Sequence, residues 1–216
     1  MGTRSAEAGS KQIGGAGQGA LLSRRRFNVD EYYAMARAGI LTEDERVELL
    51  DGEVVVMTPI GVRHQACVDR LNRRVFSRRF DDRAVVRVQG PVRLDGHSEP
   101  EPDVALLRLP LERYYVAHPT PEDVLLIVEV ADTSLQRDRR GKVPLYASAG
   151  IAEVWIVNVE ARETEVYRQP SGDRYTKVQH LRDGKVTPLA FPDETIDIED
   201  ILGPAPSDLP GVAPGG

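Results

Sequence analysis

The sequence predicts a mixed α/β (α+β) domain in which helices pack on the faces of a β-sheet. Strand-like apolar runs are the commonest pattern, with one helical pattern early in the chain and another late. The 216 residues fit one domain of ordinary size. Because Cys67 is the single cysteine, the core must form without an intramolecular disulfide or a cysteine-rich zinc site.

Composition predicts the limits of this domain and its environment. Residues 1–23 are rich in Gly, Ala, Ser and Gln, and residues 204–216 in Pro, Gly and Ala, so we expect disordered tails around one folded domain at 24–203. The apolar runs are too short for a membrane span or a signal peptide, and the single cysteine favours a reducing compartment, so we expect a soluble, cytoplasmic protein without a membrane partner. We also expect no organic cofactor. A net charge of -6 argues against attraction of nucleic acid over the whole surface but allows a local basic face.

The folded part should begin with a short helix over 29–38. Asn28 and Glu31 have the spacing of a capping box, in which each side chain accepts a hydrogen bond from the other residue's backbone. Gly39 follows the helix and can adopt the left-handed conformation that ends it.

An N-terminal β-hairpin is predicted next. Strands at 46–50 and 53–57 flank Asp51-Gly52, a pair typical of two-residue hairpin turns. Glu48 is therefore expected on a strand.

A second helix is predicted over 64–80, where apolar residues recur at helical spacing. Arginines occupy the positions between them. Such arginines are typical of a solvated helix face, but their excess over acidic residues also fits contacts to a DNA backbone. The candidates for that contact are Arg63, Arg70, Arg73 and Arg74.

The remaining pattern predicts a sheet with one further helix over 138–149. That helix should end at Gly150, carry Lys142 near its start and tolerate Pro144 in its first turns, with Asp138 as a possible cap. The predicted strands are 84–88, 91–94, 104–107, 124–130, 153–158, 163–168 and 175–178.

Four charged residues stand at the edges of apolar runs: Glu48, Asp103, Glu129 and Lys142. Taken alone, Pro102-Asp103 is typical of a turn, and Glu129 could be a strand-end carboxylate paired with an arginine. Taken together, a Pro-Asp pair, an apolar strand ending in Glu and a lysine on the next helix suggest a divalent-metal pocket. Such a pocket suits phosphodiester cleavage.

Several linked motifs carry a family resemblance over about residues 26–202. They are Arg46-Val47-Glu48-Leu49-Leu50-Asp51-Gly52-Glu53, Pro102-Asp103-Val104, the run from Val128 to Ser134, Asp138-Arg139-Arg140-Gly141-Lys142 and the run from Gly150 to Val157. In composition and order they closely resemble the Uma-type endonucleases, a branch of the restriction-endonuclease-like PD-(D/E)xK superfamily. The resemblance implies a mixed sheet flanked by helices, with a metal-dependent nuclease site at the strand ends.

The resemblance also implies roles for particular residues. Asp103 and Glu129 would be the acidic pair, and Glu48 an additional acidic residue from upstream. The superfamily's plainest pattern has a lysine two residues after the glutamate, but this chain has Ala131 there. Lys142, on the following helix, is the candidate replacement.

In the implied mechanism the chain hydrolyses DNA through a water on Mg²⁺, with Mn²⁺ as a substitute. The metal would be held by Asp103, Glu129, Glu48 and the carbonyl of Val130. Lys142 would orient or deprotonate the water, or neutralise charge on the phosphate.

Other positions and partners stay open at this point. Gln89 could contact the substrate or a ligand water, while His64 could cap its helix, transfer a proton or touch a phosphate. A homodimer is possible, because nucleases that cut both strands often pair by two-fold symmetry. The alternative function is a catalytically inactive nuclease-fold module that binds nucleic acid or a protein partner.

Overall fold

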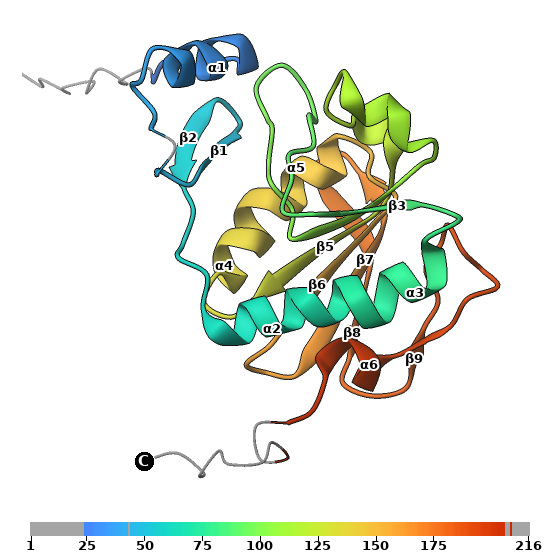
Figure 1. Cartoon of the computed structure of the whole chain (residues 1–216). Coiled ribbons are helices and arrows are strands. Elements are labelled where there is room, and N and C mark those ends of the chain that lie inside the picture. The colour runs from blue at the N-terminus through green and yellow to red at the C-terminus, as the bar shows by residue number, and fades with distance from the viewer. Residues whose placement is uncertain (1–23, 43, 206–207, 209–216) are drawn as a thin grey trace, which may run out of the picture.

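A six-stranded sheet forms the centre of the protein, with strands in the order β3-β4-β5-β6-β7-β8 (Figure 1). The computed structural model describes residues 24–42, 44–205 and 208. The predicted tail at 1–23 and most of the one at 204–216 therefore lie outside the described residues. Within the sheet, β5 and β6 pair in parallel, and every other neighbouring pair is antiparallel.

The strands and helices follow the predicted order. The sheet consists of β3 (Val85–Val88), β4 (Val104–Leu107), β5 (Val124–Ala131), β6 (Glu153–Asn158), β7 (Glu163–Ser171) and β8 (Arg174–Leu181). Two composite helices accompany it. The first comprises α2 (Val62–Arg70), a π-helical segment (Leu71–Phe76) and α3 (Ser77–Phe80), and the second α4 (Leu135–Arg137), a π-helical segment (Asp138–Lys142) and α5 (Val143–Ser148).

The two composite helices cover opposite faces of the sheet. Alternate strand residues point to opposite faces, so that on β5 Val128 packs against the first composite helix and Ile127 against the second. The first face is closed by Phe76 and Phe80, which are fully buried beside Trp155. Truncating a buried aromatic such as Phe76 to alanine typically costs about 3–5 kcal/mol. This packing holds in place the end of the sheet where β4 begins and β5 ends.

The N-terminal elements form as predicted. Helix α1 (Val29–Arg37) begins with the Asn28–Glu31 capping box. Strands β1 (Val47–Leu50) and β2 (Glu53–Val56) form an antiparallel hairpin. Asp51 and Gly52 have φ values of 49° and 76°, as a two-residue turn of this kind requires. Figure 1 shows α1 and the hairpin beside the sheet rather than in it.

The predicted strand at 91–94 is absent. The backbone N–H groups of Val92 and Leu94 donate to the carbonyls of Pro100 and Ser98, so this stretch folds back on its own loop instead of joining the sheet. A lone bridge between Leu49 and Glu99 links the loop to the hairpin.

The second composite helix begins three residues earlier than predicted, at Leu135, and Asp138 is not its cap. Asp138 lies inside the π-helical segment and accepts a hydrogen bond of 2.6 Å from the Ser134 hydroxyl. Pro144 has no N–H to donate to the preceding turn, and the N–H of Val143 instead reaches the carbonyl of Asp138. The first composite helix likewise begins earlier, at Val62.

The C-terminal part contains three short elements that the sequence pattern did not reveal. They are β9 (Lys185–Val186), β10 (Ile196–Asp197) and α6 (Ile198–Leu202), which packs against the first composite helix. Short 3₁₀ turns occupy Leu111–Tyr115 and Pro121–Asp123. None of the helices within the described residues has both the length and the apolar character needed to cross a bilayer.

Candidate active site

Three polar residues lie in a row where β3, β4 and β5 meet. Val104 pairs with Val88 on one side and with Val128 on the other. One step along this register, Asp103 lies between Gln89 and Glu129, and the N–H of Gln89 donates to the carbonyl of Asp103 at 3.1 Å. The predicted acidic pair therefore occupies adjacent strand positions.

Asp103 is held by groups from three segments. Its Oδ2 accepts a hydrogen bond of 2.8 Å from the backbone N–H of Val130 and lies 3.1 Å from Nε2 of His64. Its Oδ1 has only a long contact of 3.5 Å to the amide of Gln89. Burial alone would raise the pKa of Asp103, but His64 and the Val130 N–H stabilise the anion and keep the pKa below its usual value. Asp103 is thus ionised and held in place, and its Oδ1 has no short hydrogen bond.

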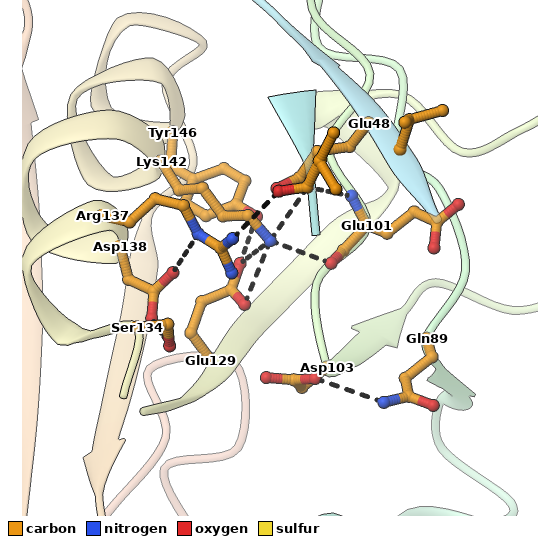
Figure 2. A network of polar contacts seen from close by, with 12 residues as sticks. Glu48, Gln89, Glu101, Asp103, Glu129, Ser134, Arg137, Asp138, Lys142 and Tyr146 are labelled. Atoms are coloured by element: carbon orange, nitrogen blue, oxygen red, sulfur yellow. Dashed lines mark hydrogen bonds and ion pairs between the residues drawn. The ribbon is translucent and has the colours of Figure 1, made fainter. Parts of the chain in front are cut away.

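Lys142 and Glu129 form the centre of a buried ionic network (Figure 2). Nζ of Lys142 lies 3.3 Å from Oε1 and 3.4 Å from Oε2 of Glu129, and 3.0 Å from Oε2 of Glu48. It also donates to the carbonyl of Glu101 at 3.0 Å. The hydroxyl of Tyr146 donates to Oε1 of Glu129 at 2.6 Å. Lys142, the candidate replacement, therefore reaches Glu129 from the helix that follows β5.

The network has a marked effect on its members' pKa values. Burial raises the pKa of Glu129 to about 8, although the Lys142 ammonium opposes this. For Lys142, burial would lower the pKa, but Glu129 and Glu48 outweigh it and hold the pKa above its usual value. Burial, followed by the charge of Glu129, raises the pKa of Tyr146 well above its usual value. Lys142 is therefore a cation, and Tyr146 remains a hydrogen-bond donor.

A cavity of about 130 Å³ opens over this network. Asp103, Glu129 and Lys142 line it, as do His64 and Gln89. The turn after β5 contributes Asp132, Thr133 and Ser134 to its wall. Two further lining residues, Arg46 and Arg137, were not predicted as site residues. Arg46 opens a family motif, but nothing in the sequence indicates that either side chain faces the cavity.

Glu48 does not share a ligand cluster with Asp103 and Glu129. Lys142 lies between Glu48 and Glu129, and Glu48 is not among the residues that line the cavity. Within the described part of the chain, the one group of three acidic, histidine or cysteine residues with ligand atoms all within 4.8 Å is Glu163, Glu165 and His180. Glu48 as a metal ligand therefore stays a prediction, and in this structure its carboxylate holds Lys142.

That other group has the character of a structural ion cluster. Glu165 accepts hydrogen bonds of 3.0–3.1 Å from Nε of Arg139, and Glu163 accepts from Arg182 at 2.9 Å and contacts His180 at 2.6 Å. These carboxylates already have arginine partners, Arg182 directly after β8 and Arg139 on the second composite helix.

The four arginines proposed for DNA contact lie in different places. Arg63 is half-exposed near the cavity, where it donates to the Val159 carbonyl at 3.1 Å and lies 3.7 Å from Asp132. Arg73 and Arg74 are exposed on the π-helical segment of the first composite helix. Arg70 packs against Gly203, so closely that a Cβ there would lie 2.3 Å from its Nε. Arg70 therefore lies against the end of the C-terminal helix, and its contact with DNA stays a prediction.

The donor atoms around the cavity fit a hard divalent cation. Asp103 and Glu129 supply carboxylate oxygens, the ligands that Mg²⁺ prefers, and Oδ1 of Asp103 is held only by the long contact to Gln89. The single cysteine of the chain, Cys67, is not a lining residue, and the sulfur in the lining is the Met57 thioether, so no thiolate competes with the carboxylate oxygens.

Comparison with known proteins places the chain among nuclease families. The Uma2 family model, described as a putative restriction endonuclease, matches residues 29–199, and the chain belongs to this family. The crystal structure of a putative nuclease belonging to DUF820 from Anabaena variabilis has a similar fold, with a TM-score of 0.58 and 17% identity over 82% of this chain and 97% of that one. No curated protein matches. The predicted family and the mixed sheet flanked by helices are confirmed.

Proposed function

We propose that this protein is a Mg²⁺-dependent endonuclease that hydrolyses phosphodiester bonds in DNA, with Mn²⁺ as a substitute cofactor. The observation that carries the proposal is the position of Lys142. It replaces the lysine missing at position 131 by reaching Glu129 from the crossover helix. An acidic pair and a buried cation then share one cavity, as hydrolysis of a phosphodiester requires.

Asp103, Glu129 and the main-chain carbonyl of Val130 would hold the metal. When bound, Mg²⁺ supplies polarisation of a phosphoryl oxygen and a lowered pKa for a water. His64 and the Val130 N–H keep Asp103 ionised and fix its orientation, so this ligand is ready before the cation arrives.

Lys142 would act as a fixed cation and not as a base. Its ammonium contacts the Glu48 and Glu129 carboxylates and the Glu101 carbonyl, so its three N–H donors all have acceptors. Its raised pKa keeps it charged at neutral pH. In this state Lys142 holds Glu129 in place and adds positive charge beside the cavity, which offsets charge that develops on the phosphate without contacting it.

The alternative, an inactive binding module, is supported less well. Lys142 is buried between the carboxylates of Glu48 and Glu129, with Asp103 nearby. Burying these charges is costly, and a hydrolase has a chemical use for them that a binding module lacks. If the protein forms a two-fold dimer, two such sites could cut both DNA strands.

Cleavage of supercoiled plasmid with Mg²⁺ or Mn²⁺ tests the proposal. We expect nicked and linear products that EDTA abolishes, and a loss of at least about 10²-fold in rate for Asp103→Asn and Glu129→Gln. Glu160→Gln is the matched control, because Glu160 is an exposed carboxylate outside the cavity lining. Absence of cleavage with either metal, or equal rates in Asp103→Asn and the wild type, would contradict the proposal. Parallel assays on RNA would show whether the substrate is DNA alone.

A further inference from the structure

We propose that Arg137 and Arg46 form an anion clamp that binds the two non-bridging oxygens of the scissile phosphodiester. The choice of a DNA phosphodiester as the anion rests on the proposed function. The inference concerns two residues to which the family resemblance assigned no role, although Arg46 opens one of its motifs. It follows from the hydrogen bonds and ion pairs that the basic side chains around the cavity already make.

The cavity needs a cation for the substrate other than Lys142. All three donors of Lys142 are engaged by Glu48, Glu129 and Glu101, and its side chain is only 3% exposed. It can hold the catalytic carboxylates, but it cannot turn outward to a phosphate without leaving them unpaired. A phosphodiester that enters beside two carboxylates still needs positive charge from the wall.

Arg137 supplies that charge from the second composite helix. It lines the cavity, its side chain is 29% exposed, and its Nε is buried without a hydrogen-bond partner among the described residues. The remaining contacts are long, with Nη1 3.5 Å from the carbonyl of Val56 and Nε 4.0 Å from Oδ1 of Asp138. Figure 2 shows the side chain extending from its helix toward Glu129 and Lys142. A buried guanidinium N–H without an acceptor is available to an anion in the cavity.

The neighbouring Arg139 shows that the missing hydrogen-bond partner is particular to position 137. Arg139 lies two residues further along the second composite helix and makes a bidentate pair with Glu165, which involves both Nε and Nη2 of the arginine. An arginine with a structural role here thus finds a carboxylate. Arg137 has none at hydrogen-bonding distance and faces the cavity instead.

Arg46 provides the second arm from a different element. It immediately precedes β1 and lines the same cavity. Its carbonyl accepts a hydrogen bond from the N–H of Met57, but its guanidinium makes no hydrogen bond or ion pair with another described side chain; burial raises the pKa of the nearby Glu101 carboxyl, and the Arg46 charge opposes that rise. A guanidinium presents a planar fork that matches two phosphate oxygens, and Arg137 and Arg46 approach from the crossover helix and the hairpin respectively. The acidic pair and the two arginines then line one cavity.

Binding and cleavage measured separately test the clamp. A fluorescein-labelled DNA duplex is titrated with protein in Ca²⁺, at several salt concentrations, and followed by anisotropy. We expect Arg137→Gln and Arg46→Gln each to weaken binding by about 10-fold and to reduce the slope of log K against log salt by about 1. In Mg²⁺, kcat/KM for plasmid cleavage should fall by about 10²-fold in Arg137→Gln, with partial recovery in Arg137→Lys.

The matched control is Arg140→Gln. Arg140 is exposed on the same helical segment, does not line the cavity and carries the same charge, so its removal should change binding by less than about 2-fold. Thermal unfolding of each variant verifies that it is folded.

The outcomes separate this inference from the proposed function. If Arg137→Gln and Arg140→Gln lose affinity equally, or neither loses any, the clamp is wrong even if the wild type cleaves DNA. If the wild type does not bind the duplex, the clamp is also wrong. If binding depends on Arg137 but no cleavage occurs with Mg²⁺ or Mn²⁺, the clamp stands and the proposed nuclease activity fails.

Discussion

Lys142 and Glu48 form an ion pair of 3.0 Å in which neither side chain is more than 3% exposed. Burying one such charge alone is far less favourable than burying the pair, because the missing partner leaves an uncompensated charge in a medium that solvates it poorly. The second oxygen of Glu48 is buried without any partner, so Lys142 is the one cation that stabilises this carboxylate in the described structure.

Removing Lys142 should therefore destabilise the fold as well as stop cleavage. We expect Lys142→Met to lower the free energy of unfolding by about 3–5 kcal/mol. Adding Glu48→Gln should recover part of that loss, because the orphaned charge is then removed. Urea unfolding of the wild type, both single variants and the double variant measures the coupling. Additive single effects would show that the two side chains do not stabilise each other.

His64 should control metal affinity through Asp103. His64→Ala removes the group 3.1 Å from Oδ2 and leaves Asp103 less well oriented, so Mn²⁺ affinity should fall by about 10–100-fold. His64→Gln, which can still donate a hydrogen bond, should retain more of it. Gln89→Ala serves as the comparison, since its contact to Asp103 is long at 3.5 Å. Titration calorimetry of the three variants would refute this role of His64 if all bound Mn²⁺ as the wild type does.

Cys67 should be unreactive until the protein unfolds. Its side chain is buried in the core under α6, and burial raises the pKa of its thiol to about 12. At pH 8 only about one thiol in 10⁴ would then be the nucleophilic thiolate. Native protein should react with a thiol reagent such as DTNB far more slowly than protein in urea. Rapid labelling without denaturant would show that α6 opens readily.

Alkaline pH should unfold the protein through its buried tyrosines. Burial raises the pKa of Tyr32 to about 12, and burial likewise raises the pKa values of Tyr33, Tyr167 and Tyr175. These raised folded-state values contribute stability that is complete below about pH 10, where the unfolded residues titrate, and that is lost as the pH rises toward 12. Absorbance at 295 nm should show these tyrosines ionising together with loss of circular dichroism. Smooth ionisation near pH 10 in folded protein would contradict the expectation.

Gly52 should be less replaceable than another glycine with the same backbone constraint. Gly52 and Gly172 have φ values of 76° and 60°, but a Cβ at Gly52 would lie 2.5 Å from Cβ of Arg26, whereas one at Gly172 meets nothing within 4 Å. Each Gly→Ala change carries the penalty of a left-handed alanine, about 1–2 kcal/mol. Gly52→Ala should add about 1–3 kcal/mol for the clash. Equal unfolding midpoints would mean that the segment before α1 moves away freely.

Local sequence signals predicted the elements that depend on few residues. The capping box at Asn28 and the turn at Asp51-Gly52 require only neighbouring side chains and backbone angles, and both form. Asp103 and Glu129 each have an ordinary explanation when taken alone, and only their combination with a lysine on the next helix predicted that they lie close together. The segment 91–94 has the apolar character of a strand but finds its hydrogen-bond partners in its own loop, which no local pattern reveals.

The rest of the site depends on contacts between distant segments. Arg46 and Arg137 are separated by the whole first half of the sheet in sequence, and only the folded hairpin and helix bring them to one cavity. Glu48 was expected among the metal ligands, but Lys142 occupies the space between it and Glu129. The sequence pattern identifies these charged residues but does not determine which of them contact one another in the folded protein.

The parallel pairing of β5 and β6 has a consequence for how such proteins are found. A parallel pair needs a long connection, and here that connection is the helix that delivers Lys142 to the end of β5. A side chain from this helix and one from the last residues of β5 can reach the same point in space, so the lysine can change its place in the chain without disturbing the sheet. A search that demands a lysine two residues after the glutamate would miss this chain. A structural search for a basic side chain that contacts this glutamate from the helix after β5 would find it.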